Sequence, residues 1–241
     1  SLDISVASTR LGRKTIIAEN LTKSYDGVKY VDGFSYIILK HDRIGIIGPN
    51  GCGKSTLINM LTGSLVPDSG AVEKGETVKT GVFSQHTEDM QPEQRVIDYI
   101  KDTAEYVQTA DGRISASQML EKFLFSPSMQ YSPIGKLSGG ERRRLYLLKV
   151  LVDAPNILFL DEPTNDLDIE TLAILEDYLD IFNGAVVTVS HDRYFLDKVC
   201  DRIFAFEGNG RIIQYEGGYS DYLRQHEERF VSDEPVKKET P

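Results

Sequence analysis

The sequence predicts an α/β fold with a mostly parallel core sheet, an N-terminal antiparallel β part and an inserted helical subdomain. Three observations predict it. A glycine-rich pattern at residues 48–55 lies between a short apolar strand and an amphipathic helix. Two near-continuous apolar runs, residues 157–160 and 185–189, are typical of parallel strands that are buried on both faces. Between these parts, residues 92–125 have the apolar spacing of helices.

The N-terminal half alternates strands with one helix. Residues 15–18 and 34–39 are predicted strands on either side of a turn at residues 25–27. The elements that follow are a strand at 43–47, a helix at 54–61 and a strand at 80–84. This part is therefore expected to bring an antiparallel β unit next to the first strands of the core sheet.

The middle of the chain is predicted to be a helical subdomain at about residues 88–152. The apolar residues with helical spacing are Val96, Ile97, Ile100, Met119, Leu120 and Phe123. Pro127 and Pro133 bracket a loop, and a helix follows Ser138. The two buried strands come after this helix, so the subdomain is inserted within the α/β core.

The glycine-rich segment matches the phosphate-binding loop pattern G-x-x-x-x-G-K-[ST] at every fixed position. It consists of Gly48, Pro49, Asn50, Gly51, Cys52, Gly53, Lys54 and Ser55, with Thr56 next on the helix. The glycines let backbone N–H groups turn inward around phosphates, and Lys54 can reach the β- and γ-phosphates. The Ser55 hydroxyl can ligate Mg²⁺, and the helix N-terminus favours an anion. The chain is therefore predicted to bind a nucleoside triphosphate.

Two carboxylates follow the apolar strand at residues 157–160. Asp161 and Glu162 are expected to face the nucleotide, because ligands gather at the carboxyl ends of parallel strands. Asp161 suits Mg²⁺, which prefers hard oxygen ligands. Glu162 is placed to act as general base on the attacking water.

Further motifs resemble those of the ATP-binding cassette (ABC) ATPases. Residues 137–141, Leu-Ser-Gly-Gly-Glu, resemble the signature motif of that family and lie upstream of Asp161. The other matches are Gln85 to the Q-loop, residues 165–168 to the D-loop, His191 to the switch histidine and Tyr25 to the aromatic that stacks on adenine. The resemblance covers roughly residues 15–223.

This resemblance implies ATP and Mg²⁺ as cofactors and a composite site made with a second cassette, either in the same parent chain or in a second copy. It implies that Gln85 senses Mg²⁺ and water together with Ser55 and Asp161, and that His191 contacts the γ-phosphate. It also implies that Ser138, Gly139, Gly140 and Asp168 contribute to nucleotide binding at the cassette interface. The chain by itself is expected to be a weak ATPase.

Three details resemble the ABC-F branch, whose members are ribosome-associated ATPases. They are Glu141 in the signature, the switch region 190–197 and the closing segment 215–223. The resemblance implies the second cassette of a Uup-like protein, with the ribosome and its RNA as partners through the parent chain. Residues 1–12 are then the end of an interdomain linker, 13–226 the ATPase domain, and 227–241 a disordered tail or a linker to a C-terminal extension.

The composition limits the other classes. The net charge is −10, so RNA binding requires a local basic patch, for which Arg142, Arg143 and Arg144 are candidates; a solvated helix face is the alternative. No apolar run approaches the ~18 residues of a membrane span, so no membrane insertion is predicted. The two cysteines do not make a disulfide framework, which favours the cytoplasm.

Two other functions stay open. One is the motor of an ABC transporter, which grips a membrane subunit through the segment between Gln85 and Leu137. The other is a DNA-associated clamp that uses ATP only to dimerise.

Overall fold

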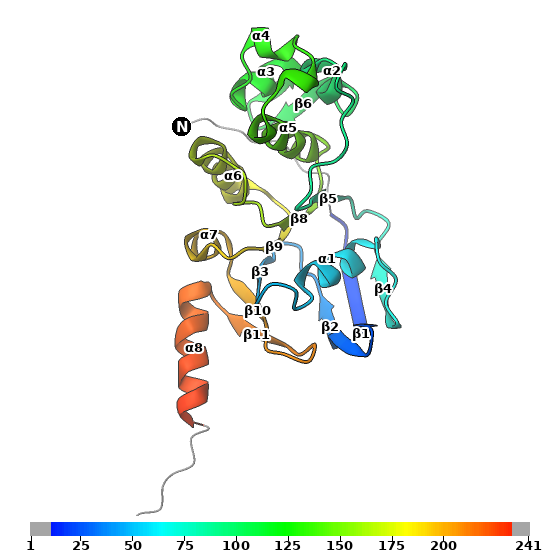
Figure 1. Cartoon of the computed structure of the whole chain (residues 1–241), viewed down its shortest axis with the longest axis vertical. Helices are drawn as coiled ribbons and strands as arrows, with labels where there is room; N and C mark the ends of the chain where they lie inside the picture. Colours follow the sequence, from blue (N-terminus) through cyan, green and yellow to red (C-terminus); the bar gives the residue numbers. More distant parts are fainter. Residues whose placement is uncertain (1–10, 233–241) are drawn as a thin grey trace, which may run out of the picture.

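The computed structural model describes residues 11–232, which form three β-sheets and the helices around them (Figure 1). The largest sheet has six strands in the order β11-β10-β3-β9-β8-β5. Their bounds are β11 Ile212–Glu216, β10 Arg202–Phe206, β3 Arg43–Ile47, β9 Ala185–Val189, β8 Ile157–Asp161 and β5 Thr80–Phe83. All neighbours are parallel except β11 on β10. The predicted mostly parallel core sheet is confirmed.

The two faces of β8 pack against different helices. Leu158 and Leu160 lie in one apolar cluster with α5 (Gly139–Val152) and α6 (Ile169–Ile181). Ile157 and Phe159 lie in a second cluster with α1 (Lys54–Thr62). Successive side chains of a strand point to opposite faces, so a strand covered on both sides appears in the sequence as a continuous apolar run.

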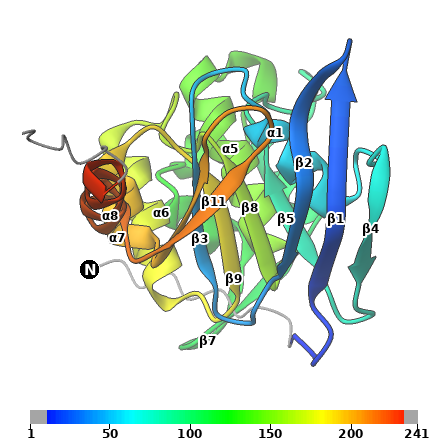
Figure 2. The same ribbon diagram turned by 90° about the horizontal axis from the view of Figure 1, so that it is seen from below.

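The predicted N-terminal antiparallel part is a three-stranded sheet beside the main one (Figure 2). Its central strand is β1 (Ile16–Tyr25), between β2 (Val28–Ile37) and β4 (Ser69–Lys74). Asp26 and Gly27 make the β1–β2 turn with φ values of 49° and 78°. Two positive φ angles are what a tight hairpin turn requires, which explains the Asp-Gly pair.

The helical subdomain contains a hairpin that the sequence analysis did not predict. Its helices are α2 Val96–Lys101, α3 Ala116–Lys122, α4 Pro127–Gln130 and α5, with a short 3-10 turn at Ile134–Lys136. Residues 106–115 form strands β6 (Tyr106–Thr109) and β7 (Gly112–Ser115) instead of the expected helix. Val107 and Ile114 face each other across this hairpin and pack on the subdomain core. The sequence signals for this hairpin are a two-residue apolar period and Gly112, which follows the turn at residues 110–111 and has φ 116°.

The C-terminal elements extend further than expected. α7 (Arg193–Val199) precedes β10, and α8 (Tyr219–Ser232) follows β11. Along α8, Tyr222, His226 and Phe230 are four residues apart, and their ring centroids lie 5.3 and 4.6 Å from one another. This aromatic contact along one helix face extends the helix. Residues 227–232 are therefore helical rather than part of a disordered tail, and 233–241 lie outside the described residues.

The folded part begins before the expected boundary at residue 13. Leu11 is 4% exposed and belongs to the core cluster of α1, and the Gly12 N–H donates to Thr77 Oγ1 at 2.8 Å. Both residues are thus packed against the domain, while residues 1–10 of the expected linker lie outside the described residues. Within residues 11–232, every helix is too short or too polar to cross a lipid bilayer.

Candidate functional site

A cavity of 530 Å³ opens where β3, β8 and β9 end and α1 begins. Its lining residues are Tyr30, Asn50, Gly51, Gly53, Lys54, Ser55, Thr56, Gln85, Asp161, Glu162, Asn165, Val189 and His191. They come from segments far apart in the sequence, which the parallel sheet brings to one edge. The structure thus gathers the phosphate loop, both carboxylates, the Q-loop glutamine and the switch histidine around one space.

The phosphate loop leaves the N-terminus of α1 free for an anion. Gly53 is the N-cap of α1 with φ 119°, and no side chain caps the helix. A Cβ on Gly53 would lie 2.7 Å from the backbone oxygen of Tyr30, so only glycine fits there. The uncapped N–H groups of the first turn and the helix dipole both favour a phosphate at this position.

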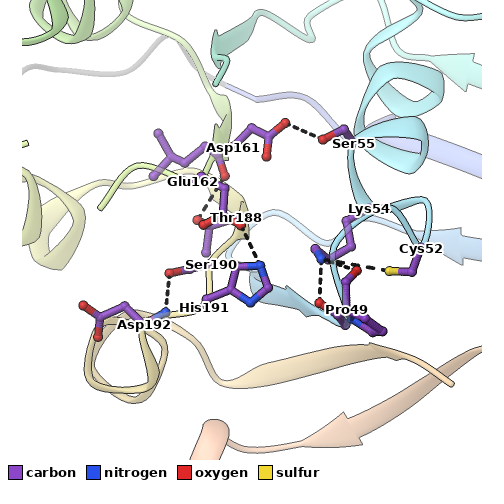
Figure 3. Close-up of polar contacts among 12 residues, drawn as sticks. Pro49, Cys52, Lys54, Ser55, Asp161, Glu162, Thr188, Ser190, His191 and Asp192 are labelled. Atoms are coloured by element: carbon purple, nitrogen blue, oxygen red, sulfur yellow. Dashed lines mark hydrogen bonds and ion pairs between the residues drawn. The ribbon is translucent and has the colours of Figure 1, made fainter. Parts of the chain in front are cut away.

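Lys54 lies folded across its own loop (Figure 3). It is 7% exposed, and its Nζ donates to the backbone oxygens of Gly48 at 2.6 Å and Pro49 at 2.8 Å. These neutral acceptors hold the ammonium at the cavity wall, from which it can turn to a phosphate. The Cys52 Sγ lies 4.0 Å from Nζ, and burial raises the pKa of this thiol. Cys52 therefore fills a free loop position and is not an activated nucleophile.

Ser55 and Asp161 form the side of the cavity suited to a metal. The Ser55 Oγ donates to Asp161 Oδ2 at 2.8 Å (Figure 3). Asp161 is 7% exposed, and its Oδ1 has no hydrogen-bond partner among the described residues. Burial raises the pKa of Asp161, whereas the Ser55 hydrogen bond and the Lys54 charge lower it.

These oxygens fit Mg²⁺. Within residues 11–232, no cluster of three or more His, Cys, Asp or Glu side chains could hold a metal by itself. Mg²⁺ usually takes one or two protein oxygens and completes its shell with phosphates and water. A hydroxyl, one carboxylate with an unpaired buried oxygen and an adjacent phosphate loop supply that set.

Glu162 and His191 meet next to the metal side. The His191 Nε2 lies 3.2 Å from Glu162 Oε1, with Glu162 4% exposed and the His191 side chain 51% exposed (Figure 3). Burial raises the pKa of Glu162, which the charge of a protonated His191 opposes. A carboxylate with a raised pKa is a stronger base toward water. The pair therefore has the chemistry of a general base with an adjacent proton donor.

The signature residues lie outside this cavity. Ser138, Gly139 and Gly140 are exposed at the N-terminus of α5 and do not line it. Asp168 does not line it either: it caps α6 by accepting from the Thr171 N–H at 2.7 Å. The signature motif and Asp168 thus lie apart from the cavity that the phosphate loop lines.

The aromatic residue that lines the cavity is Tyr30, and the adenine contact of Tyr25 stays a prediction. Tyr25 does not line the cavity, whereas Tyr30 does, and the two rings meet edge to face at 5.6 Å. Tyr25 is 44% exposed at the hairpin end. Tyr30, Asn165 and Val189 were not predicted to be site residues. Asn165 lay within a recognised motif, while nothing in the sequence distinguished Tyr30 from a core aromatic.

The three consecutive arginines do not form a basic surface. Arg143 is 3% and Arg144 7% exposed, so neither can reach an RNA phosphate; only Arg142 is partly accessible. Both buried guanidinium groups lie over phenylalanine rings. For these two residues the predicted RNA contact is wrong, and so is the alternative of a solvated face.

Comparisons with known proteins agree on one family. A family model described as "ABC transporter" matches residues 31–165. The chain is 56% identical over 240 residues to YfmR of Bacillus subtilis, described as an uncharacterized ABC transporter ATP-binding protein. It is 38% identical over 233 residues to the ATP-binding protein Uup of Escherichia coli. It is 42% identical over 213 residues to the energy-dependent translational throttle protein EttA of Haemophilus influenzae.

These alignments cover 99%, 97% and 88% of the chain but only 38%, 37% and 38% of the three relatives. Solved structures share the fold. An ATP-binding subunit of an ABC transporter matches with TM-score 0.69 at 20% identity, over 90% of this chain and 98% of that one. A dimeric ATP-binding cassette bound to ADP and Pi matches with TM-score 0.67 at 21% identity, over 84% of this chain and 98% of that one.

Proposed function

The chain belongs to the ABC ATPase family, and from this premise we propose that it is one of two cassettes of an ABC-F protein that acts on the ribosome. As an ABC ATPase domain it binds Mg-ATP. The finer proposal is that hydrolysis takes place at an interface with a second cassette and releases the protein from the ribosome. The similarity to Uup and EttA supports the branch, and the name of EttA supports translation as the process.

One observation carries the proposed chemistry: the Glu162 carboxylate and His191 lie 3.2 Å apart beside the phosphate loop. We infer that Glu162 accepts the proton of the attacking water and that His191 hydrogen-bonds the γ-phosphate. A bound Mg²⁺ would neutralise the phosphate charge at Ser55, Asp161 and Gln85. Lys54 would leave its two backbone acceptors to bind the β- and γ-phosphates.

The exposed signature motif supports the need for a second cassette. Ser138, Gly139 and Gly140 present a hydroxyl and helix N-terminal N–H groups to solvent, away from the cavity of their own chain. We propose that they bind the γ-phosphate held by the other cassette, with Asp168 at the same interface. Hydrolysis by this chain without a partner would then be slow, because each site lacks half of its contacts.

The chain spans about two fifths of the relatives it matches, so the partner cassette is proposed to lie in the same parent protein. Its second, C-terminal position in that protein follows the same resemblance.

The thiols of Cys52 and Cys200 are both free, which supports a reducing cytoplasm.

Ribosome co-sedimentation of the full-length protein carrying Glu162→Gln tests this function. The variant keeps the shape of the side chain but cannot accept a proton, so hydrolysis should fall roughly 10²–10⁴-fold. We expect it to pellet with ribosomes in ATP and not in ADP, because γ-phosphate contacts stabilise only the closed form. The matched control adds Lys54→Ala, which should abolish pelleting in either nucleotide.

Failure to pellet despite tight ATP binding would overturn the ribosome proposal. Co-purification with a membrane protein would then favour a transporter motor, which the description of YfmR suggests. Cellular function that survives Glu162→Gln would instead favour a clamp that uses ATP only to dimerise.

A further inference from the structure

Arg143 is a buried cation that the proposed hydrolysis scheme does not use. It is 3% exposed, and its guanidinium carbon lies 3.9 Å from the centroid of the Phe83 ring. Its Nη1 donates to the backbone oxygen of Ser84 at 2.6 Å. A guanidinium that stacks on a ring and donates in the plane of its fork has one defined orientation. Arg143 therefore holds the end of β5 in a specific geometry.

This contact reaches the Q-loop directly. Ser84 immediately precedes Gln85, and the Ser84 Oγ donates to the backbone oxygen of His86 at 2.8 Å. Gln85 is thus enclosed by a short hydrogen-bonded turn whose first residue is held by Arg143. Gln85 itself is exposed and lines the nucleotide cavity. Its side chain depends on this backbone for its position.

Two more residues of α5 contact the same segment. The Tyr146 hydroxyl donates to the backbone oxygen of Val82 at 3.1 Å, and the Lys149 Nζ donates to Glu88 Oε1 at 2.5 Å. Arg143, Tyr146 and Lys149 are three residues apart and lie on one helix face. Helix α5, which begins with the signature motif, therefore donates hydrogen bonds to three residues of segment 82–88.

Arg143 also lies within electrostatic reach of the metal side. Its Nε has no hydrogen-bond partner among the described residues, so this donor of the guanidinium is unused. Burial lowers the Arg143 pKa, while the charges of Asp166 and Asp161 raise it. In return, the charge of Arg143 lowers the pKa of Asp161.

We propose that Arg143 is a positioning residue for Gln85: by holding the Ser84 carbonyl against Phe83, it places the Gln85 side chain for Mg-ATP. Through Arg143, helix α5, whose N-terminal Ser138 is proposed to contact a partner cassette, also determines the geometry of the metal side of the cavity in its own chain. This inference rests on the proposed role of Gln85 at Mg²⁺.

Arg144 provides a matched control from the next position of the same helix. It is 7% exposed, its guanidinium carbon lies 4.5 Å from the Phe125 ring centroid, and it donates to the Leu124 backbone oxygen at 3.3 Å. It also pairs with Asp168 at 3.5 Å. Burial, ring stacking and a carbonyl acceptor are thus common to both arginines, whereas only Arg143 has its carbonyl acceptor at the Q-loop.

The test measures how much Mg²⁺ improves the affinity of the chain for a fluorescent ATP analogue, as the ratio of Kd in EDTA to Kd in Mg²⁺. Arg143→Met and Arg144→Met are compared in the wild-type and Gln85→Ala backgrounds. We expect Arg143→Met to lower the ratio about tenfold, the size of one lost charge-assisted hydrogen bond. Arg144→Met should change it less than about twofold. With Gln85→Ala, Arg143→Met should cause no further loss.

The outcomes separate the two proposals. If Gln85→Ala lowers the ratio and Arg143→Met does not, the inference about Arg143 is wrong and the role of Gln85 stands. An unchanged ratio for Gln85→Ala would instead overturn that role. A full further loss from Arg143→Met in the Gln85→Ala background would mean that Arg143 acts on Asp161 by charge, which also overturns the inference.

Arg143→Lys provides a second variant that retains the charge and is the conservative choice if Arg143→Met does not fold. A lysine lacks the planar fork that stacks on Phe83 and donates to Ser84. If Arg143 acts by position, Arg143→Lys should also lower the ratio. A ratio equal to that of the wild type would contradict the proposal.

Discussion

Two glycine-rich segments of this chain open a helix, yet their N-termini are built differently. The phosphate loop leads into α1 through Gly53, which has a left-handed backbone and offers no side-chain cap. The signature motif leads into α5 through Ser138, which forms a capping box with Glu141. Its two hydrogen bonds measure 2.8 Å from the Ser138 N–H to Glu141 Oε1 and 3.1 Å from the Glu141 N–H to Ser138 Oγ.

The difference bears on the proposed composite site, because it indicates which half of that site this chain forms by itself. The first turn of α1 leaves its N–H groups for a phosphate, and the cavity around it is lined by both carboxylates. In the first turn of α5, the capping box pairs the N–H groups of Ser138 and Glu141, while Gly139 and Gly140 lie exposed to solvent. A Cβ on Gly139 would meet nothing within 4 Å, so the chain's own packing does not require that glycine. We infer that its small size serves a partner.

The largest expected effect is a difference in ATP affinity between a variant of the phosphate loop and a variant of the signature motif. Lys54→Ala should weaken ATP binding by the chain alone roughly 100-fold, because it removes a charged contact with the phosphates. Ser138→Ala should leave this affinity unchanged, since Ser138 does not line the cavity. Titration with a fluorescent ATP analogue measures both, with thermal unfolding as the control for folding. A similar loss in both variants would contradict the separation.

The next largest effect is a difference in the free energy of unfolding between glycine variants of the same two segments. Gly53→Ala should lower the free energy of unfolding by about 3 kcal/mol, because φ is 119° and the new Cβ meets the Tyr30 backbone oxygen at 2.7 Å. Gly139→Ala should raise it by about 0.5 kcal/mol, because alanine suits a helix better. Urea unfolding of the two variants provides the comparison. Equal destabilisation would mean that the signature glycine also serves the fold of the chain.

A smaller effect tests the capping box. Glu141→Ala should lower the free energy of unfolding by about 1 kcal/mol, because the Ser138 N–H loses its acceptor. Glu141→Gln should be close to neutral, since the amide oxygen can accept the same bond. Urea midpoints distinguish the two. A large loss for Glu141→Gln would show that the charge of Glu141, rather than its hydrogen bond, stabilises α5.

The smallest effect concerns the buried carboxylate of the phosphate-loop side. Because the folded-state pKa of Glu162 is raised above 4.5, the unfolded chain ionises first as pH rises, and the folded state loses stability through this window. Glu162→Gln removes this loss. Its Tm should therefore exceed that of the wild type at neutral pH, with the difference shrinking as pH falls below 4.5. A difference that grows toward acid pH would contradict the raised pKa.

The local motifs were predictable because each needs specific residue types at a fixed spacing. The loop ending in Lys54 and Ser55, and the carboxylates Asp161 and Glu162 after an apolar strand, indicated one edge of a parallel sheet before any coordinates. The structure brings all four residues to one cavity. Burial on both faces also made β8 and β9 readable as continuous apolar runs.

Long-range packing decided what the sequence did not. In the sequence, three consecutive arginines predict an exposed basic surface. Only the packing of α5 against Phe83 and Phe125 shows that Arg143 and Arg144 are buried. Likewise, two aromatics near one turn are equivalent in sequence, and the docking of β2 against the phosphate loop makes Tyr30 the one that lines the cavity.

The sequence by itself therefore determined the family, the phosphate loop and the place of the two carboxylates after a buried strand, because these depend on neighbouring residues along the chain. Only the tertiary structure decided three features: the burial of Arg143 and Arg144, the position of Tyr30 at the cavity, and the hydrogen bonds from α5 to residues 82–88. Those features depend on contacts between residues about twenty to sixty positions apart, such as Arg144 with Leu124 and Arg143 with Ser84, which no local pattern records.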